Sequence, residues 1–135
     1  MNRDTLASHV LLALGILDLL RGTLHTFFAD WAVRTFAHLD LSSARQDQLT
    51  LLGVFGISNL LTGLIYILIS RKAKPLSRYV LLAIPVAYAT GRIGMMASGV
   101  SPHAAFYGRY FMAGYLALCL AAFVASGLRA PDSRR

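Results

Sequence analysis

The first apolar stretch of the chain, residues 6–28, reads LASHVLLALGILDLLRGTLHTFF. A helix rises about 1.5 Å per residue, so roughly 20 apolar residues are needed to cross about 30 Å of hydrocarbon. This stretch meets that length, and so do residues 49–69, 79–99 and 104–127. None of them alternates with the period of two that a membrane β-barrel needs. We therefore expect an all-α protein, a bundle of four transmembrane helices.

The composition agrees with lipid as the solvent of these helices. Of the 135 residues, 56% are hydrophobic and 14% are charged, whereas charged residues make up about a quarter of a typical soluble domain. The net charge of +7 is compatible with nucleic-acid binding, but the basic residues lie at the ends of apolar segments and form no continuous stripe. We expect a single integral membrane domain over residues 1–135, with no nucleic-acid partner.

Basic residues outside the spans predict the orientation, because cytoplasmic connections carry more Lys and Arg. The N-terminus, the connection after the second span and the C-terminus together hold eight of them: Arg3, Arg71, Lys72, Lys74, Arg78, Arg129, Arg134 and Arg135. The opposite side holds only Arg34 and Arg45. Both termini are therefore expected in the cytoplasm.

The connection between the first two spans has a pattern of its own. In residues 30–39, aromatic side chains such as Trp31 and Phe36 are interspersed with charged ones, in a stretch too short and polar to span. We expect a short interfacial helix in the headgroup layer, with an ordinary exposed loop as the alternative. Ser43 and Gln46 form a capping-box pattern, which predicts the start of the second span.

The spans contain four charged residues, namely Asp18, Arg21, Arg92 and Arg109. A charge at the centre of a membrane helix costs about 2.5–3.5 kcal/mol on insertion scales, so each needs an explanation. Asp18, Arg21 and His25 are three and four residues apart, which places them on one helix face, directed into the bundle. Asp18 can pair with Arg21, which lowers the insertion cost without requiring any function.

The three intramembrane arginines are expected in the outer half of the bundle. The spans contain only one carboxylate, Asp18, so two positive charges have no negative counterpart. An anionic ligand would balance them, since guanidinium groups bind oxyanions in a bidentate manner. Alternatively, the arginines snorkel to water or headgroups, and the tyrosines near them are interface anchors. The candidate ligand-binding residues are Arg21, Asn59, Tyr88, Arg92, Tyr107, Arg109 and Tyr110.

The remaining reactive residues predict no further chemistry. His9 and His25 are sixteen residues apart, while His38 and His103 lie in connections, so no metal-ligand spacing occurs. The single Cys119 excludes an internal disulfide and reads as an apolar core residue. We expect no metal site, and the sequence identifies no cofactor.

Glycines mark the faces on which helices are expected to pack. Gly53, Gly56 and Gly63 lie in the second span, and Gly91 and Gly94 lie in the third. Small residues let helices approach closely in lipid, so these positions predict packing surfaces, within the chain or against a partner.

Residues 91–102, GRIGMMASGVSP, resemble the glycine–arginine third-helix region of small bacterial DoxX-like membrane proteins, particularly their DUF4345-like branch. The resemblance marks Gly91 and Arg92 as a functional or packing landmark. It implies the four-span layout, a bacterial inner membrane and, from some relatives, an association with sulfur-compound and quinone redox complexes. Arg109 and Tyr110 stand in the region where such proteins carry an acidic residue in the fourth helix.

The sequence thus predicts an inner-membrane protein that binds an anionic or amphipathic ligand, a lipid or a metabolite, in a polar cavity near the outer leaflet. An accessory role beside a partner membrane subunit, or in a homo-oligomer, fits the same features. The alternative is a membrane enzyme that acts on a lipid-soluble substrate or quinone, with Asp18 or His25 as the acid or base.

Overall fold

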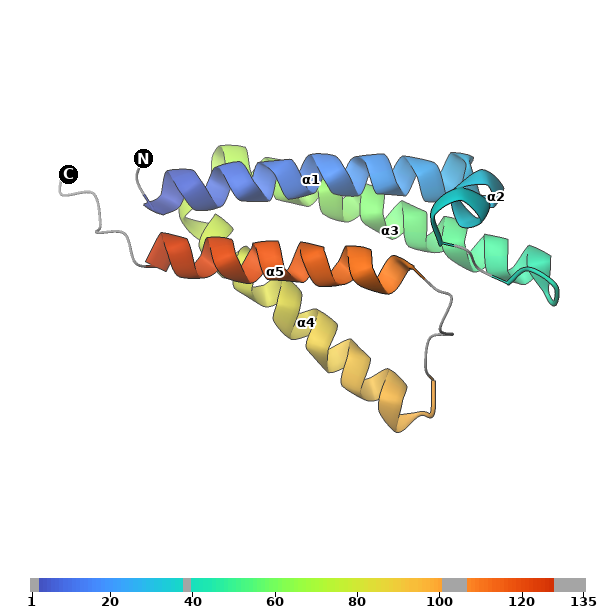
Figure 1. The fold of residues 1–135 in the computed structure, drawn as a ribbon. Helices are drawn as coiled ribbons and strands as arrows, with labels where there is room; N and C mark the ends of the chain where they lie inside the picture. The colour runs from blue at the N-terminus through green and yellow to red at the C-terminus, as the bar shows by residue number, and fades with distance from the viewer. Residues whose placement is uncertain (1–2, 38–39, 101–106, 128–135) are drawn as a thin grey trace.

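Helices make up nearly all of the protein that the computed structural model describes, namely residues 3–37, 40–100 and 107–127 (Figure 1). Four helices are long and apolar enough to cross a membrane: α1 (Arg3–Phe27), α3 (Arg45–Lys72), α4 (Ser77–Ala97) and α5 (Gly108–Gly127). A short 3-10 turn, η2 (Lys74–Leu76), leads into α4. These ranges contain no strand, so the predicted all-α fold with four membrane-length helices is confirmed.

The second long helix begins earlier than the sequence pattern predicts. α3 starts at Arg45, four residues before the expected position, and the preceding Ala44 has a left-handed φ of 48°. No side chain caps this helix, so the capping-box prediction for Ser43 and Gln46 is wrong. The reason is that Ala44 occupies the capping position, and Gln48 donates its side-chain amide to the Ser43 carbonyl at 2.8 Å.

The two ends of the bundle differ in how closely α4 approaches α5. We call the end where α1 and α4 begin the terminal end, and the opposite end the distal end. At the terminal end, the Arg78 Cζ lies 4.8 Å from the centre of the Phe123 ring, and the buried core joins Leu11 of α1 to Leu81, four residues into α4. Toward the distal end, α4 diverges from α5 (Figure 1).

α1 and α3 form the most extensive helix contact, and glycines make it possible. Gly15 faces Gly63 and Gly22 faces Gly56, so each helix contributes two glycines seven residues apart. A Cβ at Gly63 would lie 2.7 Å from the Gly15 carbonyl oxygen, and one at Gly22 would lie 2.8 Å from the Gly56 carbonyl oxygen. Only a hydrogen fits here, because the obstructing atoms belong to the opposite backbone. Such close backbone approach drives helix association in lipid, where apolar side chains gain little by leaving the solvent.

The other glycines that the sequence marked have no such neighbour. An added Cβ at Gly53, Gly91 or Gly94 would meet no atom of the described residues within 4 Å. The predicted packing surface within the chain is thus confirmed for Gly56 and Gly63 only. Gly91 and Gly94 lie on the part of α4 that diverges from α5.

A short helix connects α1 to α3, as predicted for this connection. It comprises α2 (Ala29–Ala32) and a π-helical turn, η1 (Val33–Ala37). Asp30 holds it in place through ion pairs with Arg34 at 3.1 Å and with Arg45, at the start of α3, at 2.6 Å. The hydrogen bonds that Arg45 and Arg34 donate keep the pKa of the exposed Asp30 carboxyl below its usual range.

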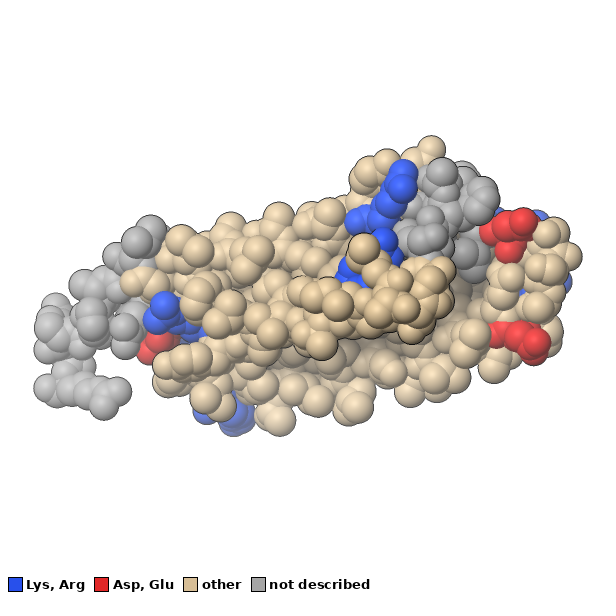
Figure 2. All heavy atoms as spheres, turned by 90° about the horizontal axis from the view of Figure 1, so that it is seen from below, with Lys and Arg blue, Asp and Glu red and all other residues tan. Residues whose placement is uncertain are grey.

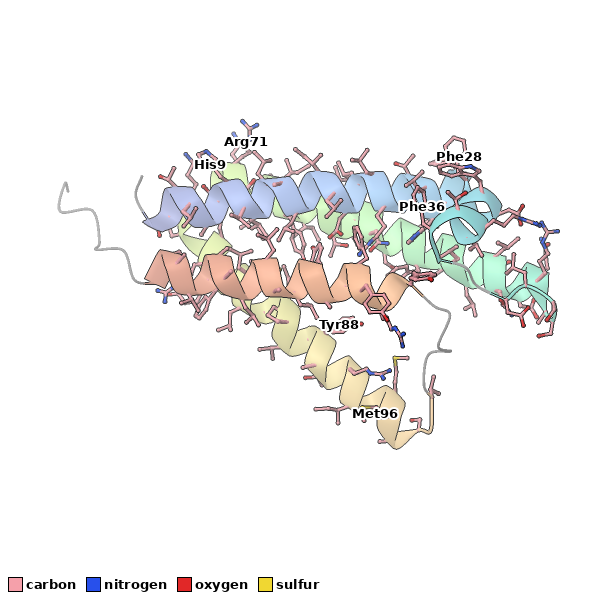
Figure 3. The ribbon with its side chains drawn as sticks, in the orientation of Figure 1. His9, Phe28, Phe36, Arg71, Tyr88 and Met96 are labelled. Atoms are coloured by element: carbon pink, nitrogen blue, oxygen red, sulfur yellow. The ribbon has the colours of Figure 1, made fainter. Side chains whose placement is uncertain are left out.

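The short helix also carries exposed aromatic rings. Trp31 contacts Phe36 edge to face, with 5.3 Å between the ring centres. In Figure 3, Phe28 and Phe36 lie at the distal end of the bundle. The side chains of Phe28, Trp31 and Phe36 are each more than half exposed. Exposed aromatic rings beside charged groups are typical of a segment at the headgroup level of a membrane.

Replacing Gly63 with alanine tests the glycine contact. The added methyl group would meet the Gly15 carbonyl oxygen at 2.7 Å, and overpacking of this kind costs about 1–3 kcal/mol. We expect Gly63→Ala to unfold at a lower mole fraction of dodecyl sulfate than the unmodified protein. Gly53→Ala is the matched control in the same helix, where the new methyl group meets open space. Equal destabilisation by both substitutions would contradict the helix contact described here.

Candidate functional site

Asp18 and Arg21 lie one turn apart on the face of α1 that points into the bundle. Their side chains form an ion pair, with 3.2 Å between Asp18 Oδ1 and Arg21 Nη2, and Asp18 is only 3% exposed. The pairing expected from the three-residue spacing is therefore confirmed. It lowers the cost of placing each charge among apolar helices, because neither group faces lipid alone.

Neighbouring helices extend this pair into a network. From α5, the Tyr115 hydroxyl donates to Asp18 Oδ2 at 3.1 Å. Toward α3, Arg21 Nη2 donates to Asn59 Oδ1 at 2.8 Å, and Arg21 Nη1 contacts the Met112 sulfur of α5 at 3.3 Å. We call Asp18, Arg21, Asn59 and Tyr115 the buried polar network. It joins α1 to both α3 and α5.

Two aromatic rings enclose the Arg21 guanidinium. Its Cζ lies 5.6 Å from the ring centre of Phe55 and 5.6 Å from that of Tyr115. A desolvated cation–π contact is worth about 2 kcal/mol or more. Only 15% of the Arg21 side chain is exposed. Arg21 is thus held by a carboxylate, an amide and two rings, and little of its surface is left for a ligand.

His25 lies one turn beyond Arg21 in α1 and is also packed. Its ring stacks on Phe55, with 5.8 Å between the ring centres. The buried His25 Nδ1 has no hydrogen-bond partner among the residues with described positions, and neither do Arg21 Nε and Asn59 Nδ2. Asp18 and His25, the two acid–base candidates, therefore share a helix but form no hydrogen bond with each other.

The other two arginines of the predicted cluster do not join the buried polar network. Arg109, the second residue of α5, donates from Nη2 to the Tyr110 hydroxyl at 2.8 Å, and its Cζ lies 4.7 Å from the centre of that ring. Arg92 forms no hydrogen bond or ion pair with any residue that the structure describes. Figure 2 shows basic side chains over the distal ends of α4 and α5, while the acidic side chains lie elsewhere on this face.

The three candidate tyrosines belong to the same two helix ends. Tyr88 lies one turn before Arg92, and in Figure 3 it is on the side of α4 that faces α5. The rings of Tyr107 and Tyr110 are 6.2 Å apart, just before and within the first turn of α5. Each of the three side chains is at least 40% exposed. They are accessible to a ligand or to lipid headgroups.

Sequence reasoning missed Tyr115 and Phe55 as partners of the charged pair. Tyr115 lies within the fourth apolar stretch, where a hydroxyl in lipid needs a hydrogen-bond partner, and that position is a readable signal. Phe55 carries no such signal, because its contact with Arg21 depends on how α3 packs against α1.

The described part of the chain contains no arrangement of side chains suited to metal binding or to thiol chemistry. It contains no group of three His, Cys, Asp or Glu side chains placed to hold a metal ion. Cys119 is fully buried in the apolar core. His38 and His103, and the predicted start of the fourth span at residue 104, lie outside the described residues.

Comparisons of the chain with protein-family models, with curated proteins and with solved structures find no match. The binding role proposed below therefore rests on the geometry and charge of the chain's own residues.

Removing one member of the ion pair should destabilise the protein more than removing both. Asp18→Leu leaves the Arg21 charge buried without its carboxylate, and breaking a buried pair in this way costs about 3–5 kcal/mol. The double variant Asp18→Leu/Arg21→Leu carries neither charge, so we expect it to be more stable than Asp18→Leu. Unfolding free energies of the four proteins in a double-mutant cycle measure the coupling. Strictly additive effects of the two substitutions would show that the charges do not stabilise each other.

Proposed function

We propose that this is a bacterial inner-membrane protein that binds an anionic, amphipathic ligand at the distal ends of α4 and α5. The ligand is a lipid or a metabolite that carries a carboxylate or phosphate group. Arg92 and Arg109 bind this group, and Tyr88 and Tyr110 line the site beside them. The observation that carries the proposal is the contrast between Arg21, which has its carboxylate, and the two arginines that have none.

An arginine in hydrocarbon costs about 2.5–3.5 kcal/mol at a helix centre. Arg92 lies five residues before the end of α4, which is about 8 Å along the helix axis. Within the described ranges, neither Arg92 nor Arg109 has a carboxylate at ion-pair distance. An oxyanion shared by the two guanidinium groups would balance both charges through bidentate hydrogen bonds.

Apolar side chains around these arginines favour an amphipathic ligand over a free inorganic anion. Four of them on α4 and α5 are at least 46% exposed: Ile93, Met95, Met96 and Phe111. An acyl or similar chain attached to the acidic group would lie against them. Sites of this kind combine a largely apolar lining with a few polar groups that fix orientation.

The buried polar network has a structural role in this proposal. Arg21 and Asn59, which the sequence grouped with the ligand, bind each other at 2.8 Å and set the position of α1 against α3. Asp18 is 3% exposed and is enclosed by Arg21 and Tyr115, so this packing leaves a substrate no access to its carboxylate. The His25 ring is stacked on Phe55. We therefore favour a binding function over the enzymatic alternative.

The proposed orientation places the terminal end in the cytoplasm. The segment that joins α3 to α4 at this end carries the basic residues Arg71, Lys72 and Lys74. At the distal end, Arg34 and Arg45 are both paired with Asp30. An excess of Lys and Arg favours the cytoplasmic side, and the DoxX-like resemblance adds the bacterial inner membrane as the location.

Arg92→Gln should weaken binding of an anionic amphiphile. The substitution removes a charged hydrogen-bond donor worth about 1.5–3 kcal/mol, so we expect affinity for palmitate, used as the probe, to fall by about tenfold or more. Native mass spectrometry of the full-length protein in detergent measures this as the fraction of protein that carries the probe. It also shows whether the purified protein retains an anionic lipid or metabolite.

Arg34→Gln is the matched control, since it removes the same charge at the same end of the bundle from an exposed ion pair. Its affinity for palmitate should stay within about twofold of the unmodified protein, as expected for a screened surface charge. Arg92→Gln and Arg34→Gln proteins with equal affinity would show that Arg92 snorkels and binds no ligand.

Reporter fusions check the orientation. We expect alkaline phosphatase fused after Arg135 to be inactive, because the enzyme needs the oxidising periplasm for its disulfides. The same reporter fused after Val100, at the distal end of α4, should be active. High activity of the C-terminal fusion would reverse the proposed topology.

A further inference from the structure

A second group of basic side chains surrounds a groove between α1 and α3 at the terminal end. The groove has a volume of about 200 Å³, and its lining residues are Ser8, His9, Leu12, Ser70, Arg71 and Lys74. Figure 3 shows His9 and Arg71 together on the outside of the α1–α3 pair. The lining contains no acidic residue, so the groove presents positive charge.

We propose that this terminal groove binds the phosphate group of an anionic phospholipid through His9, Arg71 and Lys74. A guanidinium, an ammonium and an imidazole N–H are the side-chain donors that suit a phosphate. None of the three side chains forms a hydrogen bond or ion pair with another residue in the described ranges. Their donors are therefore available to a ligand.

The inner wall of the groove explains why there is room for a phosphate. Ser8 and Ser70 are each 3% exposed, and they belong to facing helices. Their hydroxyls donate to carbonyls of their own helices, Thr5 at 3.0 Å and Ile67 at 2.8 Å. These small side chains leave a hollow behind the basic rim. Its volume is below the roughly 300–1,000 Å³ of pockets for drug-sized molecules, so it suits one compact polar group.

An apolar track leads from the basic rim toward the middle of the bundle. On α1, Leu12 lines the groove three residues after His9, and Ile16, seven residues after it, is 49% exposed. On α3, Leu68 and Leu64, three and seven residues before Arg71, are 60% and 58% exposed. Residues with these spacings share one helix face, and the two helices are antiparallel, so both stripes run the same way.

This arrangement matches a phospholipid and not a free phosphate ion. Arg71 is the last residue but one of α3, which places the rim at the level of lipid headgroups if α3 spans the membrane. The acyl chains then lie along the apolar track below it. Basic pockets between membrane helices commonly bind anionic headgroups. The site is independent of the ligand proposed for the distal end and of the orientation of the chain.

Native mass spectrometry of the full-length protein in detergent tests the terminal groove, with phosphatidylglycerol and phosphatidylcholine as probes. We expect phosphatidylglycerol to bind more tightly, and Arg71→Gln and Lys74→Gln each to lower its affinity by about fivefold. Lys72→Gln is the matched control: it removes the same charge from the neighbouring position, which does not line the groove. Its effect should stay below about twofold.

A second pair of variants separates loss of the site from loss of the fold. Leu12→Trp fills the groove without changing its charge and should also reduce phosphatidylglycerol binding, whereas Ala83→Trp, at an exposed position of α4 that does not line the groove, should not. All of these variants are compared in the Arg92→Gln background, in which the distal site no longer contributes to phosphatidylglycerol binding. Equal affinity for the two lipids would overturn the proposal. So would an equal effect of Lys72→Gln and Arg71→Gln, or displacement of phosphatidylglycerol by inorganic phosphate.

Discussion

The ion pair between Arg21 and Asp18 connects the first helix to both helices that flank it, through Asn59 in α3 and Tyr115 in α5. A charge in the interior of a membrane protein is stable only when its hydrogen-bonding groups are satisfied by other helices. The positions of these three helices at this level are therefore coupled. Rotation of α1 about its axis would leave a guanidinium and a carboxylate against lipid.

The glycine contact between α1 and α3 acts together with this network. Close packing of Gly15 on Gly63 and Gly22 on Gly56 brings the two backbones together on either side of Arg21. The Arg21 guanidinium is then within reach of Asn59, and it also contacts the aromatic rings of Phe55 and Tyr115. α4 lies outside this arrangement and contacts the others mainly near the terminal end, so its distal half is left open (Figure 1).

Much of the fold could be predicted from the sequence because each of its signals is local. Apolar runs of sufficient length specify the four membrane-length helices, and the three-residue spacing of Asp18 and Arg21 specifies their common face. The short helix before α3 follows from its mixture of aromatic and charged residues. The capping residue of α3 was predicted wrongly, because Ala44, with a left-handed backbone, and not Ser43 precedes the helix.

The candidate site, too, could be predicted from the sequence only in its local features. The sequence by itself determined that three arginines face a single intramembrane aspartate, since charge and approximate depth can be counted along each helix. The three-residue spacing also paired that aspartate with Arg21. Only the tertiary structure decided that Asn59 and Tyr115 complete this pair, and that Arg92 and Arg109 lie on helix ends that diverge. It also brought His9 beside Arg71, sixty-two residues apart in the chain. The physical reason is that lipid exerts no strong hydrophobic force between helices, so close backbone contacts and polar contacts select the partner helices. The residues that make these contacts are far apart in the chain, and local spacing does not say which helices meet.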